Sequence, residues 1–253
     1  MTHQINYNER TGRHSFFSVK EIPWHGLGAI VQEYPNSQQA LEYAGLDFEV
    51  EKRELYAVGD SQIDVPDYYA TVRTDTNEAL GVVGKDYQIV QNVNAFDFFD
   101  SIVGSKTGIL YETAGALGRG ERIFITAKLP DYIKVGKNDL IEQYLFLTTS
   151  HNGSSSITAA FTPIRVVCNN TLNAALQGVT NAVRIRHTVN VHWKLKEAHK
   201  LLGISNRLNK ELGDIFNHWS KVRITDKHVK RLVQLALAPN KETLDSLYQD
   251  RDE

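Results

Sequence analysis

The segment from Gln143 to Leu176 constrains the fold most, because it contains several successive secondary-structure elements within a short stretch. Its successive parts are a β-rich strand (144–149), a polar turn (151–154), a second strand (156–167) interrupted at Pro163, and a helix (169–176). Asn152-Gly153 is the strongest short signal for a β-hairpin turn. Asn169 or Asn170 can cap the start of the helix. The order predicts an antiparallel hairpin that packs against a helix.

The rest of the chain also shows the sequence patterns of β-strands and amphipathic helices. Strands are predicted at 48–58, 68–73, 79–83, 109–116, 122–129 and 183–191, and helices at 37–44, 93–103, 192–222 and 225–238. Polar stretches at 60–67 and 131–139 are predicted to be loops. We therefore expect an α+β fold in which an antiparallel β-sheet of hairpins packs against helices and the C-terminal part is helical.

The domain organisation follows from composition along the chain. Residues 1–20 are polar and predicted to be a flexible N-terminal segment, residues 21–191 an α+β core domain, and residues 192–253 a helical C-terminal region. Within Ile22–Gly28, Trp24 and Leu27 are predicted to form a hydrophobic plug above a glycine turn. The charged end, 240–253, resembles the start of another helix, so we expect the natural product to continue past Glu253.

Composition limits the class of protein. The chain is 42% hydrophobic and 23% charged, as in ordinary soluble globular proteins. No apolar run approaches 18 residues and the N-terminus lacks an apolar leader segment, so we expect a cytoplasmic protein with no membrane partner. The single cysteine, Cys168, excludes an internal disulfide framework and a Cys-based zinc site.

The net charge of −2 results from an acidic N-terminal half and a basic C-terminal half. Residues 1–150 contain 13 Lys/Arg and 21 Asp/Glu, whereas residues 151–253 contain 15 and 9. Between residues 163 and 231 there are 13 Lys/Arg residues and 4 Asp/Glu residues. Such a basic half indicates an anionic partner, most commonly nucleic acid; the alternative is a solvated face that balances the acidic half.

The sequence contains no strong motif for a catalytic site. There is no phosphate-binding loop, no dinucleotide fingerprint and no His-Glu-x-x-His metal motif. His187, His192 and His199 do not have common metal-ligand spacing, and Cys168 would need a base such as His151. A pair of helix carboxylates, Asp97 and Asp100, is more typical of an exposed face than of a Mg²⁺ site. We expect no enzyme activity, no cofactor, no metal and no catalytic residue.

Basic and aromatic side chains favour binding. The predicted strand 183–191 places two arginines on one polar face, where they can follow a phosphate backbone. Tyr87, Tyr111 and Phe161 lie between the basic residues and can stack on bases, although core packing is the alternative. The predicted nucleic-acid-binding residues are Arg119, Arg122, Lys128, Arg165, Arg184, Arg186, Lys194, Lys196 and Trp193.

Four motifs together resemble a known family. They are PWHGLG, VGKDYQIVQN with its following FDFF helix, GRGERIFITAKLP, and TPIRVVCNNTLNAAL. They resemble the phage/plasmid-like proteins, a family of unknown function from mobile elements, over about residues 15–235. The resemblance implies mobile-element biology and no particular reaction.

A second similarity is at the level of fold. The order of helix 93–103, hairpin 109–129, hairpin 144–167 and helix 169–176 is similar to the β-β-β-α core of single-strand annealing proteins of the RecT/Redβ and Erf type. This similarity implies a homo-oligomeric ring or filament that binds single-stranded DNA and mediates annealing or recombination. The alternatives are a protein-interaction factor that docks on a host or phage complex, and a nucleic-acid enzyme using Asp97, Asp100 or His151.

Overall fold

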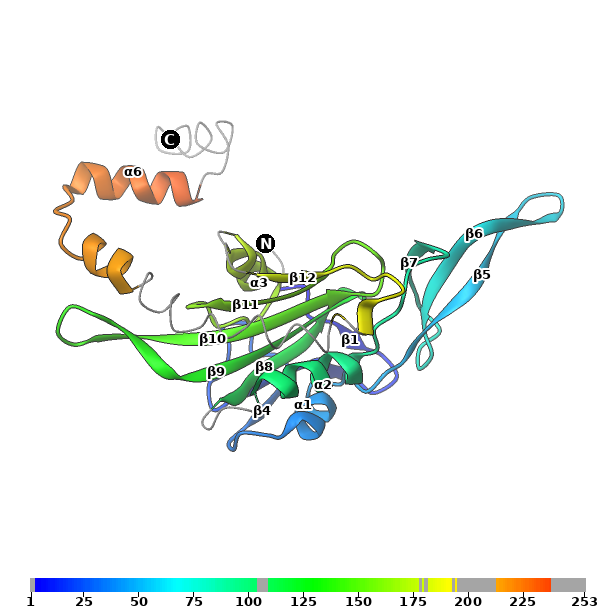
Figure 1. Cartoon of the computed structure of the whole chain (residues 1–253), viewed down its shortest axis with the longest axis horizontal. Coiled ribbons are helices and arrows are strands. Elements are labelled where there is room, and N and C mark those ends of the chain that lie inside the picture. The colour runs from blue at the N-terminus through cyan, green and yellow to red at the C-terminus, as the bar shows by residue number, and fades with distance from the viewer. Residues whose placement is uncertain are drawn as a thin grey trace, which may run out of the picture.

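The computed structural model describes residues 3–103, 109–177, 179, 182–192, 194 and 213–237. Most of its strands pair antiparallel, which confirms the α+β class with a predominance of β-sheet. Seven strands form the main sheet in the order β12-β11-β10-β9-β8-β3-β4 (Figure 1). Their bounds are β3 Phe16–Val19, β4 Ala29–Val31, β8 Leu110–Leu117, β9 Arg122–Val135, β10 Asp139–Ser150, β11 Ile157–Thr162 and β12 Val183–Ile185.

The β9–β10 hairpin is the longest pairing in the main sheet. It runs from Arg122↔Ser150 to Val135↔Asp139, so the predicted loop at 131–139 is largely strand and only residues 136–138 form a turn. Tyr132, Ile133 and Val135 favour a strand, and Gly136 with φ +61° closes a tight turn. The neighbouring strand β8 pairs with β9 only as far as Lys128, and β11 pairs with β10 only as far as Tyr144. The end of the hairpin therefore projects beyond the sheet (Figure 1).

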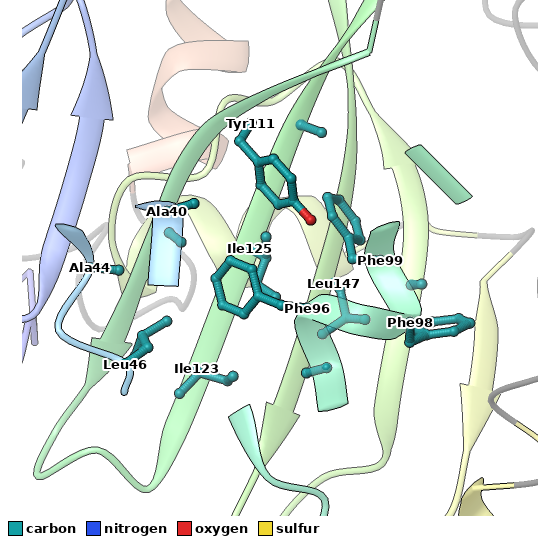
Figure 2. Packing of buried hydrophobic residues seen from close by; sticks show 14 of the residues in the cluster. Ala40, Ala44, Leu46, Phe96, Phe98, Phe99, Tyr111, Ile123, Ile125 and Leu147 are labelled. Carbon is teal, nitrogen blue, oxygen red and sulfur yellow. The ribbon is translucent and has the colours of Figure 1, made fainter. Parts of the chain in front are cut away.

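Two helices cover one face of the main sheet. They are α1, Ser37–Tyr43, and α2, Asn92–Val103. The helical spacing of Phe96 and Phe99 directs both rings onto buried strand residues such as Ile125 and Leu147 (Figure 2). Fully burying each aromatic ring stabilises the fold by roughly 1.5–3 kcal/mol. The N-cap of α1 is Asn36, which forms a capping box with Gln39.

The opposite face packs on helix α3, Asn169–Leu176, as predicted from sequence. Its core contains Phe124, Phe146 and Leu172. The N-cap is Cys168 rather than either asparagine, and the hydroxyl of Thr171 accepts from the backbone N–H groups of residues 167 and 168. We call this the α3 face.

A smaller antiparallel sheet contains β5, Val50–Val58, β6, Gln62–Arg73, and β7, Ala79–Gly84. The three-stranded meander is confirmed, but the predicted loop at 60–67 is largely strand. The register between β5 and β6 shifts between the pairs Glu54↔Tyr69 and Tyr56↔Asp64, which creates a bulge. Pro66 lies in this bulge, where its backbone does not have to donate a hydrogen bond to the neighbouring strand. Figure 1 shows β5 and β6 projecting as a two-stranded arm.

Arg73 at the end of β6 joins the two sheets. Its side chain is completely buried and makes a bidentate ion pair with Asp75, at 2.8 and 2.9 Å. The guanidinium also donates to the carbonyl of Arg119 and stacks 3.8 Å above the Phe48 ring. A buried arginine therefore connects the small sheet to the turn between β8 and β9.

The N-terminal segment differs from the prediction. Residues 7–8 and 13–14 form a small hairpin, β1 Tyr7–Asn8 and β2 Arg13–His14, and all four residues of β3 are buried in the main sheet. Phe16 and Phe17 are completely buried, on opposite faces of that sheet. The apolar SFFSV sequence therefore belongs to the core rather than to a flexible segment.

The C-terminal region is described only in part. Residues 213–219 are helical, and α6 spans Asp226–Leu237, close to the predicted helix at 225–238. The side chain of Asn217 connects this region to the β9–β10 hairpin through Gly136 and Lys134. Most of the predicted helix at 192–222 lies outside the described residues. No helix in the described ranges has the length and apolar character needed to cross a membrane.

Candidate nucleic-acid interface

The register of the main sheet brings two predicted arginines to the α3 face. Residues paired across neighbouring strands point to the same side of a sheet. On β9, Arg122 pairs with Ser150 of β10. Two residues earlier on β10, Thr148 pairs with Thr158 of β11. Thr158 in turn pairs with Arg184 of β12. Arg122 and Arg184 therefore share this face, about 14 Å apart across three strand spacings and about 7 Å apart along the strands.

Two more arginines lie at the same end of the sheet. Arg119 is in the turn between β8 and β9, and Arg186 follows the end of β12; both are exposed. Among the described residues none of the four forms an ion pair. We call Arg119, Arg122, Arg184 and Arg186 the arginine strip.

Arg122 differs from the exposed arginines of the strip because part of its guanidinium is buried. Its Nε is buried and has no hydrogen-bond partner within the described structure. Burial lowers the pKa of the Arg122 guanidinium below its usual value. A buried cationic donor without a partner is costly, and an anionic oxygen placed here would satisfy it.

Lys128 lies on the same face but at the other end of the sheet. It forms an ion pair with Glu142, which also accepts from the Tyr144 hydroxyl. Although burial opposes the shift, the contact with Glu142 raises the pKa of Lys128. This lysine is neutralised by a carboxylate, so the structure separates it from the free arginines.

Arg165 is held within the protein. The segment that follows β11 crosses the α3 face and brings Arg165 to Glu112, 2.9 Å away, and to Glu21, 3.2 Å away. Its guanidinium also donates to the Ser18 hydroxyl and the Val19 carbonyl. With its donors engaged between two carboxylates and β3, Arg165 stabilises the strand crossing rather than presenting an open cation.

Glu112 retains one unused oxygen in this buried network. Its Oε1 accepts from Arg165, whereas Oε2 is buried and has no partner among the described residues. Burial raises the pKa of Glu112, although Arg165 opposes this. Burial also acts to raise the pKa of Glu142, but the hydrogen bonds from Lys128 and Tyr144 outweigh burial. The pKa of Glu142 is therefore lowered.

The remaining predicted contacts are distributed differently. Lys194 is exposed in a short helical turn, whereas Trp193 and Lys196 lie outside the described residues. Tyr111 is buried against α2 and its hydroxyl donates to Asp100 at 2.7 Å, so this tyrosine belongs to the core. Tyr87 stacks on His187 with ring centroids 4.7 Å apart.

Two of the histidines considered for catalysis and metal binding, His151 and His187, have structural partners, and His199 lies outside the described residues. His151 contacts the Asn92 side-chain oxygen through Nε2 at 2.9 Å, and burial lowers its pKa to about 3. His187 contacts the Thr149 hydroxyl and the Gln88 carbonyl, each at 3.0 Å. Within the described ranges no three His, Cys, Asp or Glu side chains are arranged to hold a metal ion.

The sequence prediction missed a group of rings near the N-terminus. Trp24 is not a buried plug, because 66% of it is exposed. It contacts His25 and His3, and a groove of about 950 Å³ lies next to this region. The PWHGLG motif and the basic RTGRH sequence were visible signals, but their proximity depends on the β1–β2 hairpin.

Comparison with known proteins adds one match. Residues 79–253 match a family described as "Domain of unknown function (DUF932)". No curated protein and no solved structure matches the chain.

Proposed function

The chain belongs to the DUF932 family, a family of unknown function, and from the geometry of the arginine strip we propose that it binds single-stranded DNA. The observation that carries the proposal is the half-buried, unpaired guanidinium of Arg122 on the same sheet face as exposed Arg184. Phosphate oxygens would satisfy this donor, and the neighbouring arginines would follow the backbone.

The mechanism is electrostatic. Each arginine that neutralises a phosphate releases a counterion, which favours binding at low salt. The protein then acts as a non-enzymatic, cytoplasmic mediator of single-strand annealing or recombination in a phage, plasmid or other mobile element. Lys128 and Arg165 are not part of this proposal, because carboxylates of the same chain already neutralise them.

Charge reversal tests the proposal. We expect R184E/R186E to lower affinity for a labelled single-stranded oligonucleotide by on the order of tenfold or more at low salt. R53E/K85E is the control, because it reverses the same number of exposed basic side chains, on β5 and directly after β7, that are already paired with Glu51 and Asp67. Unchanged binding of R184E/R186E at low salt, with the same thermal stability as the wild type, would refute the arginine strip as the binding surface.

A protein-interaction factor is the second candidate, and the β5–β6 arm favours it. Several of its apolar side chains are exposed, including Val58 at 88% and Ile63 at 61%. Between residues 51 and 68 the arm contains five acidic and two basic side chains, whereas residues 213–237 contain two and five. The second candidate would use this arm to dock on a host or phage complex, whereas contact with a second copy of the chain would produce the ring or filament of the first candidate. Binding to naked oligonucleotide distinguishes the two candidates.

A further inference from the structure

Five ring-bearing side chains gather beside the N-terminal hairpin. We call them the ring cluster: His3, Tyr7, His14, Trp24 and His25. The His3 ring lies 5.7 Å from that of His25, 6.4 Å from that of His14 and 6.5 Å from that of Trp24. The rings therefore form a continuous surface contributed by three separate chain segments.

Backbone hydrogen bonds fix the orientation of the imidazoles. Nε2 of His25 lies 3.0 Å from the Val167 carbonyl, and its Nδ1 accepts from the Leu27 N–H. Nδ1 of His3 accepts from the Ile5 N–H. Gly28, with φ +85°, has Phe16 so close that a Cβ would clash, so this tight turn needs glycine to present Trp24 and His25.

The ring cluster is open to solvent. Trp24 is 66% exposed and Tyr7 is 51% exposed. Burial lowers the pKa of His25, and His3 and His14 lower it further, although the Val167 carbonyl opposes this. His25 is therefore neutral at pH 7, and the cluster offers ring faces on which a flat aromatic ligand can stack.

Basic residues border the ring cluster on one side. Arg10 and Arg13 are exposed in the β1–β2 hairpin and form no ion pair within the described ranges. Together with His14 they line one part of the groove of about 950 Å³, and the buried Nδ1 of His14 has no partner among the described residues. His14 thus belongs to both the ring cluster and the groove.

Acidic residues also line the groove. Asp75 is neutralised by Arg73, whereas Glu42 accepts from the Gln38 amide. Asp47 completes this set. Carboxylates accept hydrogen bonds from sugar hydroxyls and from exocyclic amino groups of bases, but they repel phosphate. The groove is therefore suited to a ligand with one anionic group and several neutral donors.

We propose that the ring cluster and the adjoining groove form a subsite for unpaired nucleotides, in which bases stack on Trp24 and Tyr7 and a phosphate contacts Arg10 and Arg13. A duplex keeps its bases stacked inside, so only single-stranded nucleic acid can use such rings. This inference rests on the proposed function and names the part of the protein that selects single strands.

The subsite is connected to the arginine strip through the N-terminal segment. The Gly118 N–H donates to the Gln4 carbonyl at 2.8 Å, and the Asn6 side chain donates to the Gly118 carbonyl at 2.9 Å. Arg119 is the next residue, so the segment that carries His3 and Tyr7 lies against the turn that carries the first arginine of the strip. A strand that contacts Arg119 can continue onto the ring cluster.

The test measures the fluorescence of Trp24 itself. In the W193F/W219F variant of the full chain, Trp24 is the only tryptophan. We expect its fluorescence to be quenched by a single-stranded oligothymidylate and not by a duplex of equal length. In a separate anisotropy titration with labelled oligothymidylate, W24A should reduce affinity by about tenfold or more. I22A, an equally exposed change on the same loop, should leave it unchanged.

The outcomes separate the two proposals. Quenching together with the specific loss in W24A supports the subsite. Oligonucleotide binding without quenching, and with W24A equal to wild type, overturns the subsite but leaves the arginine strip in place. Absence of oligonucleotide binding by the wild type at low salt overturns the proposed DNA binding and the subsite with it. Quenching of Trp24 by duplex as strong as by single strand overturns the selection of single strands.

Discussion

Individual residues show that identical side-chain types have different roles in this protein. Arg122 is half-buried with an unpaired Nε, Arg165 is held by two carboxylates, and Arg73 is completely buried. The partners decide which role each arginine has. An arginine whose charge is already neutralised gains little from a phosphate, because the new contact must replace an existing one.

His151 makes stability depend on pH. Its folded-state pKa is lowered to about 3 by burial and by nearby His187 and Arg73. The unfolded chain binds a proton near pH 6.5, whereas the folded protein does not until far lower pH. We therefore expect the free energy of unfolding to be maximal above about pH 6.5 and to fall as the pH drops toward 3.

Urea unfolding between pH 4 and 8 checks this expectation. H151Q cannot titrate, so its stability should decline less steeply between pH 6.5 and 4 than that of the wild type. His187, whose pKa burial also lowers, will leave a residual slope. Parallel pH profiles for H151Q and the wild type would contradict the assignment.

Replacing Arg73 should be far more damaging than replacing an exposed arginine. R73M removes the ion-pair partner of Asp75 and leaves the carbonyl of Arg119 without its Arg73 donor. We expect a loss of about 3–5 kcal/mol in the free energy of unfolding. R53M is the control, since the Arg53–Glu51 pair is exposed and should contribute less than about 1 kcal/mol. Equal losses in both variants, measured by urea unfolding, would argue against the role given to Arg73.

At the scale of elements, two long hairpins extend beyond the sheets that support them. Among the described residues, no further strand pairs with the β9–β10 hairpin beyond Lys128 and Tyr144, and the β5–β6 arm projects from the small sheet (Figure 1). A two-stranded ribbon in water is only marginally stable by itself. Exposed apolar side chains on such a ribbon are therefore expected to contact another protein surface.

The arm gives a prediction about assembly. V58D/I63D adds charge to two side chains that are already exposed, at 88% and 61%. We expect the melting temperature to change little, while the particle mass measured by light scattering falls to that of a single chain. Y7A, a change of an exposed side chain in another hairpin, should keep the wild-type mass. If the mass of V58D/I63D equals that of the wild type, the arm does not mediate assembly.

For the whole molecule, the relevant quantity is the number of phosphates that the surface neutralises. The four arginines of the strip predict a slope of roughly −3 in a plot of log affinity against log salt for single-stranded DNA. R184Q/R186Q should reduce the magnitude of this slope by about 1.4. K128Q should leave the slope unchanged, because Glu142 already neutralises this lysine. A larger change in K128Q than in R184Q/R186Q would place the backbone contacts at the other end of the sheet.

Sequence by itself determined the local elements. Helix α3 has the predicted bounds, and the turn at 151–154 lies where Asn152-Gly153 indicated. These signals are local, because hairpin turns and helices depend on residues a few positions apart. The same reasoning failed at 131–139 and 60–67, where pairing with a long neighbouring strand overrode the turn-forming residues.

Tertiary structure alone decided which side chains could form a site. Sequence identified the basic residues, but Arg165 meets Glu112 from 53 positions away, and Lys128 meets Glu142 across a hairpin. Likewise, Trp24 meets the distant ring of His3 because the β1–β2 hairpin and β3 hold the N-terminal segment against the main sheet. Charge and ring type are properties of a residue, whereas neutralisation and exposure depend on the partners that the fold supplies.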